Sequence, residues 1–361
     1  MIALPLELQP ILDALWAHHI TPIVVGGYVR DALLGIHSKD IDIELYNMHS
    51  LEELETILKP FGKLNLVGKS FGVIKLRLKE LEIDFSPPRI ESKHARGHKG
   101  FEIHCDFTLD FATAAHRRDF TINAIGYNPQ TKTLLDPYHG VDDLRNKRLM
   151  CVDEKTFIED PLRPLRAVQF VARFDLTCDP VLLNLCKEMI SKGALEELPK
   201  ERIFEEIKKL LLLSTKPSIG LSLLKEMGGE SLFEPPSQVA WNHALLRVDK
   251  LSQNSPKSLA LLFGALLLET KDPDRILKSI TAERSLLRTT KIVIEHAHKF
   301  GSLVTPPPPL LQGRDLISLG RTPSEEFKTI LESAYKEQLN QKFGSHKQGL
   351  KWLKEYLVTK P

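Results

Sequence analysis

The chain has 361 residues, of which 42% are hydrophobic, and its formal net charge at pH 7 is +2. This length allows two to four domains of an ordinary globular protein. No apolar run reaches the ~20 residues that a membrane span requires, and the N-terminus lacks the layout of a signal peptide. The small net charge neither requires nor excludes a nucleic-acid partner, so any RNA-binding surface would be a local basic patch.

Four cysteines lie along the chain without the spacing of a metal site or a disulfide framework: Cys105, Cys151, Cys178 and Cys186. Cysteines scattered in this way are typical of reduced thiols in an intracellular protein. We therefore expect a cytoplasmic protein. The sequence does not indicate its oligomeric state.

Apolar periodicity and turn signals predict a mixture of helices and strands over about the first 150 residues. The expected helices are 6–19, 28–35 and 108–126, and the expected strands are 22–26, 40–45, 63–66, 72–78, 81–85 and 132–136. Residues 87–106 are rich in Pro, Gly, Lys and His and are expected to form a loop. Within it, basic residues flanked by glycines at 93–100 fit a mobile segment or, equally well, a solvated loop without a task.

Strand patterns nearly vanish after residue 150, and helical periodicity replaces them. The expected helices are 160–174, 179–192, 200–213, 217–227, 238–252, 256–270, 283–299, 313–319, 323–342 and 346–357. Four consecutive prolines, Pro306–Pro309, form a stiff extended break before the last three helices. The sequence therefore predicts an α+β protein: a head with a mixed sheet and helices at 1–150, then an all-helical neck at 151–215, body at 216–305 and tail at 306–361.

The most informative stretch joins a glycine pair to a pair of aspartates. Gly26 and Gly27 follow the apolar run 23–25, and glycine lets the backbone approach a ligand closely. Asp40 and Asp42 are two residues apart in a predicted strand, so both carboxylates point to one face. Side-by-side carboxylates repel each other unless cations hold them, which is the arrangement used in two-metal phosphoryl or nucleotidyl transfer. Each feature alone is more often a plain turn or a solvated strand edge.

The combination is more specific than its parts. G-G-x-V-R-D-x-L-L-G, followed after a few residues by D-x-D, resembles the signature of the class II tRNA nucleotidyltransferase and poly(A) polymerase family. This family belongs to the polymerase-β-like nucleotidyltransferase superfamily, and the resemblance implies such a fold for the head. It also implies that Asp40 and Asp42 hold Mg²⁺, and that Gly26, Gly27 and Arg30 cradle the triphosphate.

Two further stretches carry the resemblance within the head. R-R-D-F-T-I-N-A at 117–124 matches the second motif of the family nearly letter for letter, and implies that Arg118 and Asp119 help to hold the ribose. In a helix, Asn123 would lie one turn from Asp119 on the same face, so we expect it to bind the nucleotide together with Arg118 and Asp119. Asp84 falls where the family often places a third acid, which could orient a metal or activate the attacking hydroxyl. A third motif, at 136–144, is turn chemistry that we interpret as structural.

The stretch E-D-P-L-R-P-L-R-A at 159–167 is the most specific for function. Asp160 is a natural helix N-cap before Pro161, and the simplest interpretation is a well-capped helix. A carboxylate can, however, accept from the exocyclic amine of C or A, while a guanidinium donates to ring acceptors. E-D-x-x-R followed by L-R-A is similar to the nucleotide-selecting motif of the family. The resemblance implies that Asp160 and Arg163 select C and A, that Arg166 binds nucleotide, and that Glu159 orients Arg163.

Three later segments are interpreted more simply. L-P-K-E-R-I-F-E-E-I-K-K-L-L at 198–211 resembles the last shared motif and is expected to stabilise the neck, with Glu205 pairing with Lys208 and Lys209. His243 begins a region where some relatives carry a metal phosphohydrolase domain, but the partner ligands are missing here, so we expect no metal. Lysines in 311–361 are by default a solvated face, and become a phosphate-tracking surface only if the substrate is RNA.

The leading functional hypothesis is template-independent addition of C, C and A to the 3′ end of tRNA from CTP and ATP, by two-metal transfer with release of pyrophosphate. A split-activity enzyme that adds only CC or only A would share every motif. A poly(A) polymerase would share the head, although the stretch 68–74 lacks the basic-aromatic-His pattern associated with that branch. An inactive RNA-binding relative is disfavoured by the intact aspartate pair.

Overall fold

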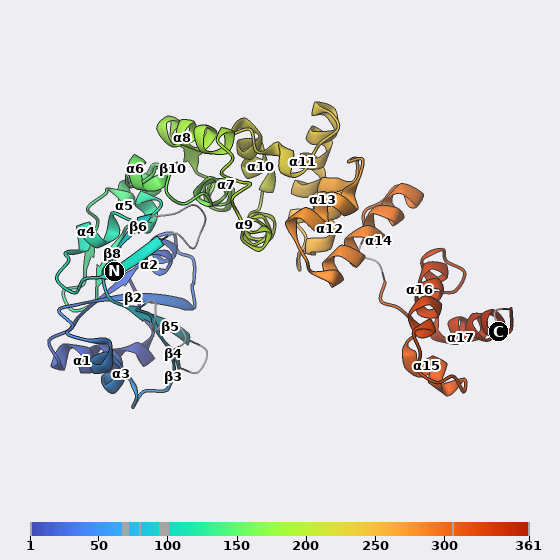
Figure 1. The fold of residues 1–361 in the computed structure, drawn as a ribbon, viewed down its shortest axis with the longest axis horizontal. Helices are drawn as coiled ribbons and strands as arrows, with labels where there is room; N and C mark the ends of the chain where they lie inside the picture. Colours follow the sequence, from blue (N-terminus) through green and yellow to red (C-terminus); the bar gives the residue numbers. More distant parts are fainter. Residues whose placement is uncertain (1, 67–71, 79–80, 94–100, 305–306, 360–361) are drawn as a thin grey trace. The chain divides into compact units, whose positions relative to one another are not determined.

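The computed structural model describes residues 2–66, 72–78, 81–93, 101–304 and 307–359. The chain divides into two compact units, Met1–Glu234 and Pro235–Pro361, which are described separately (Figure 1). The mobile segment expected at 93–100 lies outside the described residues except for Lys93. Residues 67–71, which include most of the stretch that bears on the poly(A) polymerase alternative, also lie outside them.

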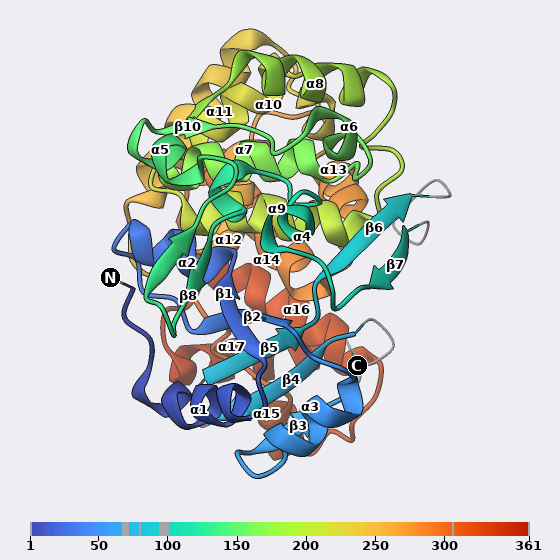
Figure 2. The ribbon, with the colours of Figure 1, turned by 90° about the vertical axis from the view of Figure 1, so that its left-hand side faces the viewer.

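The first unit is built on a mixed sheet with the strand order β3-β4-β5-β2-β1-β8-β9. Its strands are β1 (Thr21–Val25), β2 (Asp40–Tyr46), β3 (Lys63–Asn65), β4 (Ile74–Leu78), β5 (Leu81–Ser86), β8 (Gly126–Asn128) and β9 (Thr133–Leu135). β2 and β5 are parallel, whereas the other neighbours are antiparallel. Figure 2 shows β1, β2, β5 and β4 following one another across the sheet. The six expected strands are confirmed, and β8 was not expected.

The two faces of the sheet differ because side chains alternate along each strand. One face is buried, and its side chains include Val24, Ile41, Ile43, Ile83 and Phe85. The helix α1 (Gln9–Ala17) packs against β1 and against α3 (Leu51–Leu58). On the other face, α4 (Phe111–Ala115) covers Ile23 and Val25 at the β1 side of the sheet. The polar residues of β2 and β5 on this second face remain available for chemistry.

The loop expected at 87–106 is wrong in part. β6 (Arg89–Lys93) and β7 (Phe101–Cys105) pair as antiparallel strands, separate from the main sheet. The composition of this stretch indicates turns, but strands are also stabilised by cross-strand hydrogen bonds that composition does not reveal.

The helix expected at 108–126 is wrong beyond α4. Phe120 has extended backbone angles (φ −127°, ψ 149°) and forms an antiparallel bridge with Cys151. A short 3-10 turn follows at Thr121–Asn123, and β8 begins at Gly126. Phe120 is fully buried, so tertiary packing and the bridge override the local helical pattern.

Helices continue the first unit after residue 139. They are α5 (Gly140–Arg145), α6 (Glu154–Phe157), α7 (Arg163–Phe174), α8 (Pro180–Ser191), α9 (Lys200–Leu213) and α10 (Pro217–Glu226), with a short parallel pair between β10 (Arg148–Leu149) and β11 (Thr177–Cys178). α7 is the central element and packs against both α9 and α10. A Cβ atom on Gly220 would lie 2.5 Å from the carbonyl oxygen of Val168, so the close approach of α10 to α7 requires glycine there.

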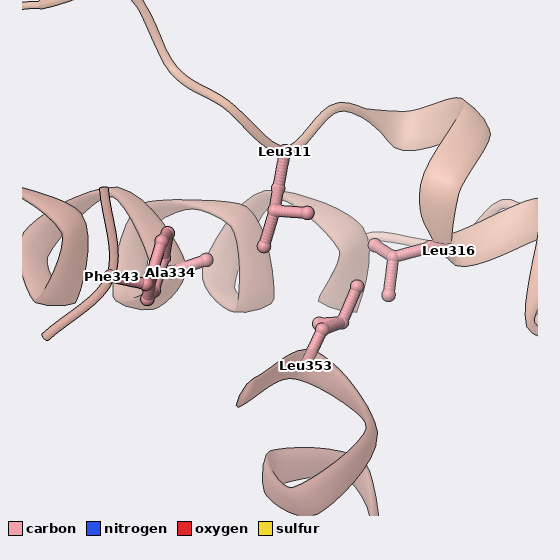
Figure 3. Close-up of a cluster of buried hydrophobic side chains, with 5 residues drawn as sticks. All are labelled: Leu311, Leu316, Ala334, Phe343 and Leu353. Atoms are coloured by element: carbon pink, nitrogen blue, oxygen red, sulfur yellow. The ribbon is translucent and has the colours of Figure 1, made fainter. Parts of the chain in front are cut away.

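The second unit is helical. Its helices are α11 (Gln238–Ser252), α12 (Leu259–Leu267), α13 (Pro273–Ile280), α14 (Arg284–Phe300), α15 (Gly313–Ser318), α16 (Glu326–Leu339) and α17 (His346–Thr359). α13 was not expected, and the others were. A small apolar core joins the last three helices and contains Leu311, Leu316, Ala334, Phe343 and Leu353 (Figure 3). In neither unit does a described helix have the length and apolar character needed to cross a bilayer.

Candidate active site

The acidic residues of β2 project together from the open face of the sheet. Asp40 and Asp42 are exposed while Ile41 and Ile43 between and beyond them are buried, which confirms the alternation expected from the sequence. In the parallel pair with β5, Asp42 lies opposite Asp84. The structure therefore brings the three acids predicted to be catalytic to neighbouring positions on two adjacent strands.

Burial and the neighbouring charges act on the pKa of Asp42 in opposite directions, and the net effect is a rise. Partial desolvation raises the pKa of Asp42, although the residue remains open to solvent, while Arg118 opposes this shift and Asp84 reinforces it. Lys75 on β4 donates to Asp84 at 2.5 Å, and this hydrogen bond raises the pKa of Lys75. Asp84 thus already pairs with Lys75. The raised pKa of Asp42 means that its charged form is disfavoured, so an added cation would stabilise that form.

These carboxylates suit a hard divalent cation supplied together with substrate. Within the described residues, no group of three or more His, Cys, Asp or Glu side chains is arranged to hold a metal by itself. Mg²⁺ prefers oxygen ligands, keeps several waters, and is typically bound by one or two carboxylates plus substrate phosphates. Asp40 and Asp42 match this donor set.

Glu44 continues the same face of β2 and was not singled out from the sequence. Its side chain is 1% exposed, and it accepts hydrogen bonds from Arg118 at 2.7 Å, Arg117 at 3.1 Å and the Tyr46 hydroxyl at 2.9 Å. Burial alone would raise the pKa of Glu44, but the charges of Arg118 and Arg117 outweigh it and lower the pKa. The alternation Asp40, Asp42, Glu44 was the available signal, since all three share one strand face.

The glycine pair brings the backbone close to Arg118. Gly26 has a positive φ of 67°, a conformation that side chains rarely adopt, and it precedes α2 (Gly27–Leu33). A Cβ atom on Gly26 would lie 3.0 Å from Nη1 of Arg118. Glycine is therefore needed both for the turn and for the space beside the guanidinium.

Arg30 lines the same region, but its guanidinium is already engaged. It is 5% exposed, donates to Asp31 through two nitrogen atoms (2.8 and 2.6 Å), and donates to the Asn123 side chain at 2.5 Å. It also stacks on Phe170 and Phe174 of α7, with centroid distances of 5.0 and 4.7 Å. These contacts connect α2 to α7, so Arg30 stabilises the packing of the two helices as well as lining the site.

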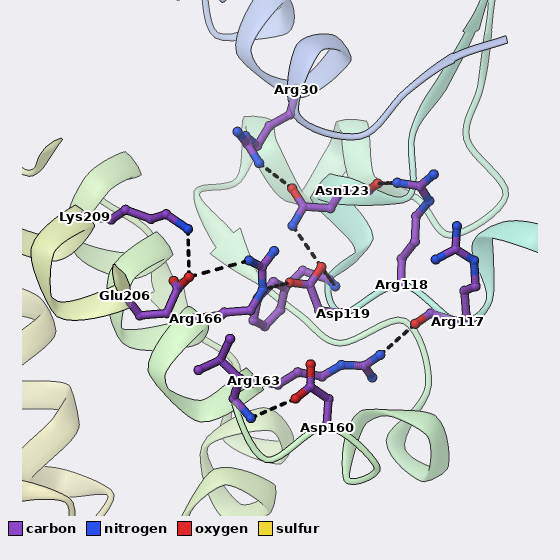
Figure 4. A network of polar contacts seen from close by, with 12 residues as sticks. Arg30, Arg117, Arg118, Asp119, Asn123, Asp160, Arg163, Arg166, Glu206 and Lys209 are labelled. Atoms are coloured by element: carbon purple, nitrogen blue, oxygen red, sulfur yellow. Dashed lines mark hydrogen bonds and ion pairs between the residues drawn. The ribbon is translucent and has the colours of Figure 1, made fainter. Parts of the chain in front are cut away.

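Asp119 is the centre of a buried network (Figure 4). Its carboxylate accepts from Arg166 at 2.6 Å and from the Asn123 side chain at 2.9 Å. Burial would raise the pKa of Asp119, but Arg166 and these hydrogen bonds lower it overall. The predicted proximity of Asp119 and Asn123 is confirmed, although a tight turn and not a helix produces it.

Asp160 and Arg163 lie in the turn that leads into α7. The helix begins at Arg163, so the predicted start at Pro161 is wrong; Asp160 caps the preceding turn by accepting from the Leu162 amide at 3.0 Å. Pro164 falls in the first helical turn, where no hydrogen bond is lost. Asp160 also pairs with Arg202 of α9 at 3.5 Å.

Backbone carbonyls, and not Glu159, hold Arg163. Its two terminal nitrogen atoms donate to the carbonyl oxygens of Thr156 and Arg117, each at 2.7 Å. No hydrogen bond joins Glu159 to Arg163 in the part of the chain that the structure describes, so that expectation is corrected. Because these carbonyls belong to two separate segments, the position of Arg163 depends on the packing of both.

α9 contributes more to the site than the neck-stabilising role predicted for it. Glu206 is 3% exposed and lies 4.0 Å from Arg166. Lys209 pairs with Glu206 at 2.8 Å, not with Glu205 as expected, whereas Lys208 does pair with Glu205 at 3.1 Å. The helical spacing of acids and bases indicated ion pairs, but only the fold shows that Glu206 faces inward.

Two hollows share Asp42 and the arginines. The larger, of about 380 Å³, contains every predicted nucleotide-binding residue together with Asp42, Arg89 and Arg117: Gly26, Gly27, Arg30, Arg118, Asp119, Asn123, Asp160, Arg163 and Arg166. The smaller, of about 210 Å³, adds Glu44, Asp84 and Ser86 to Asp42 and the arginines. Asp40 lines neither hollow. The basic walls of the larger hollow can hold phosphates, and its turn at Asp160 can contact a base.

Two other predicted features lie elsewhere. Asp136 accepts from the amides of Gly140 and Val141 (2.7 and 2.9 Å), so the third motif caps α5, as expected. In the second unit, His243 lies 3.3 Å from Glu269, which also binds Arg247 at 2.5 Å. The absence of metal chemistry at His243 stays a prediction.

Comparison with known proteins identifies relatives of this chain. Residues 23–150 match the poly A polymerase head domain, and residues 175–235 match the probable RNA and SrmB-binding site of polymerase A. The chain is 37% identical over 231 residues to the multifunctional CCA protein of Aliivibrio salmonicida, covering 61% of this chain and 54% of that protein. It is 34% identical over 262 residues to the multifunctional CCA protein of Psychromonas ingrahamii, covering 68% and 61%.

The fold has a counterpart among solved structures. The Thermotoga maritima CCA-adding enzyme in complex with tRNA superimposes with a TM-score of 0.63 and 22% identity, covering 99% of this chain and 97% of that one. The chain spans about half the length of the curated relatives it matches first. The sequence motifs, the two matched domains and the shared fold agree that the chain belongs to the family of class II tRNA nucleotidyltransferases and poly(A) polymerases.

Proposed function

We propose that the protein adds C, C and A to the 3′ end of tRNA, without a template, from CTP and ATP. The observation that carries this proposal is the larger hollow, where Asp42 faces a group of arginines and the turn at Asp160 and Arg163. Two relatives named as multifunctional CCA proteins support the choice of substrate, and the fold is that of a CCA-adding enzyme in complex with tRNA. Since tRNA is the proposed substrate, we also propose that the protein acts in the cytoplasm.

Asp40 and Asp42 would hold Mg²⁺, which would neutralise charge on the attacking and leaving oxygens when bound. The protein's own part is mostly positioning and electrostatic stabilisation. Glu44 holds Arg118 beside the glycine turn and also pairs with Arg117, and the guanidinium groups of both arginines line the larger hollow, where they would face the triphosphate. Asp84, on the neighbouring strand, would orient the 3′-hydroxyl of the terminal ribose or accept its proton.

Selection of the base would come from the turn before α7. C and A both present an amino donor beside a ring acceptor, whereas U and G present the opposite order, so one acceptor and one donor can distinguish the pairs. Asp160 would accept from the amine and Arg163 would donate to the ring. The bonds of Arg163 to the carbonyl oxygens of Thr156 and Arg117 limit its movement, which favours a fixed reading of the base edge.

Asp119 would act on the ribose and on its neighbours together. Its oxygens already accept from Arg166 and Asn123, so a ribose hydroxyl would join an existing network. This arrangement favours ribonucleotides, because a deoxyribose lacks the 2′-hydroxyl that would donate a further hydrogen bond to the Asp119 carboxylate.

The direct test is transfer of labelled CMP to a tRNA that lacks its terminal CCA. We expect Mg²⁺-dependent extension with stoichiometric release of pyrophosphate, and no extension when a terminal 2′,3′-dideoxyribose replaces the acceptor ribose. Extension that continues with Asp42→Ala, or phosphate release without extension, would contradict the proposal.

A further inference from the structure

A basic surface lies on β4 and β3, on the same face of the sheet as the acids of β2 and β5. The registers of β2, β5, β4 and β3 align two rows of side chains across the sheet. One row runs Asp42, Asp84, Lys75, Asn65, and the other runs Asp40, Glu82, Arg77, Lys63. In both rows acids on β2 and β5 give way to a base on β4. We call Lys63, Lys75 and Arg77 the basic sheet surface.

The basic sheet surface borders a groove of about 680 Å³. The side chains that line it include Lys63, Lys75, Arg77 and Asp84. Asp84 also lines the hollow of about 210 Å³, and Asp42 joins that hollow to the larger one. A series of depressions therefore leads from the larger hollow, past the acids, to the basic sheet surface.

The order of the strands gives this series a direction. β2 lies between β1 and β5, as Figure 2 shows. The glycine turn that would hold the triphosphate follows β1, whereas Asp84 and the basic sheet surface lie on the β5 side. Nucleotidyl transfer places the attacking and leaving oxygens on opposite sides of the reacting phosphorus. The hydroxyl should thus arrive from the β5 side.

We propose that the unpaired 3′ end of the acceptor RNA crosses β5, β4 and β3, with its backbone phosphates on Lys63 and Arg77. This inference rests on the proposed function for the position of the reacting hydroxyl. Neighbouring strands are about 4.8 Å apart, so Arg77 lies about one strand spacing and Lys63 about two from the row of β5 acids. Both side chains are exposed, and within the described residues neither forms an ion pair.

Charge argues for a nucleic-acid strand over a free nucleotide. Lys75 forms an ion pair with Asp84, so it marks the boundary between the acidic strand β5 and the basic strand β4. A mononucleotide would be held in one place, whereas cations spaced along successive strands suit a backbone that continues away from the site.

The test uses the full chain and the double variant Lys63→Ala/Arg77→Ala. We expect a higher KM for tRNA lacking CCA, with the KM for CTP and kcat at saturating RNA unchanged. The slope of log affinity against log salt should flatten by about 0.7 for each phosphate of the single strand that is no longer neutralised. Lys59→Ala/Arg145→Ala removes the same charges from exposed head positions outside the groove and should leave all of these values unchanged.

A binding assay separates this inference from the proposed function. RNA with an unpaired 3′ end is compared with a blunt duplex of the same stem, without nucleotide. If the wild-type protein transfers no nucleotide but the double variant alone loses the preference for the unpaired end, the proposed function fails and the RNA surface stands. If the double variant matches the wild type in affinity, salt slope and KM for RNA, the RNA surface is refuted, whatever the activity.

Discussion

The larger hollow, where we propose that the nucleotide binds, and the C-terminal tail both carry many charges, but the environments of these charges differ. In the larger hollow, Asp119 and Arg163 are at most 9% exposed, as is Glu44 in the smaller hollow beside it, and each is bonded to other protein groups. In the tail, Lys347, Lys351 and Lys354 are exposed on α17, at spacings that place them near one helix face. Buried, bonded charges are preorganised and sensitive to single changes, whereas exposed charges contribute weakly and depend on salt.

The largest effect is expected at the β2 acids. Asp42→Ala or Asp40→Ala should lower nucleotide incorporation by more than about 1000-fold, because the proposed Mg²⁺ site needs both carboxylates. RNA binding, measured separately, should persist. Near-normal turnover of either variant in Mg²⁺ would refute the metal assignment. It would also mean that the hollow is no more sensitive to single changes than the tail.

Glu44 tests whether buried charge pairs support the hollow. Glu44→Gln should destabilise the protein by about 3–5 kcal/mol, because Arg117 and Arg118 would lose the anion that compensates their burial. Denaturant unfolding at pH 7 measures this change in the free energy of unfolding. The exposed Glu201→Gln is the matched control on the same unit and should change stability by less than about 0.5 kcal/mol.

The same variant predicts a pH dependence with a definite sign. The pKa of Glu44 is lowered in the folded protein, so its ionisation stabilises the fold above its ordinary value of 4.5. The stability difference between wild type and Glu44→Gln should therefore be full at neutral pH. It should shrink as the pH falls below 4.5 and through the lowered pKa. A difference that stays constant down to pH 3 would show that Glu44 acts through packing alone.

A smaller effect, on selectivity, is expected at the turn before α7. Arg163→Ala and Asp160→Ala should reduce the preference for C and A over U and G by about 1–3 kcal/mol, since each removes one hydrogen bond to the base edge. Competition between CTP and UTP on one RNA primer gives this ratio directly. If both variants slow all four nucleotides equally, the pair serves only to shape the turn.

The smallest effect is expected in the tail. Replacing Lys347, Lys351 and Lys354 by Ala should weaken tRNA binding and flatten its salt dependence by about 0.7–0.9 for each phosphate that is no longer neutralised, while the KM for CTP stays unchanged. Thermal unfolding should show that the triple variant remains folded, because the tail core of Leu311, Leu316 and their neighbours is untouched. Unchanged salt slopes would mean that the tail only packs and does not bind RNA.

Sequence motifs predicted which residues lie together around the larger hollow better than they predicted the backbone there. The alternation at Asp40 and Asp42 is local, so it could be anticipated, whereas the proximity of Asp119 to Asn123 was predicted from a helix that is not present there. The turn at Thr121 could not be anticipated, because buried packing of Phe120 decides it. The strands β6 and β7 were missed for another reason, because their composition indicates turns and does not reveal the pairing of one strand with the next.

The supporting residues were also hidden in the sequence. Glu44 and Glu206 look like ordinary acids in an amphipathic strand and helix, and only the fold shows that each is buried against arginines. Arg163 was expected to be held by a neighbour in sequence, but carbonyl groups from Thr156 and Arg117 hold it. Long-range interactions of this kind require the three-dimensional arrangement.

The most direct test of the proposed CCA addition uses three tRNA primers and one nucleotide at a time. The primers end before the first C, after one C and after CC, and each is incubated with CTP, ATP, UTP or GTP. We expect that CTP extends the first two primers and stops after CC, that ATP adds one A to the third, and that UTP and GTP extend none. Long A tails on every primer, or extension by no nucleotide, would contradict CCA addition, while activity with only CTP or only ATP would restrict the protein to half of the reaction.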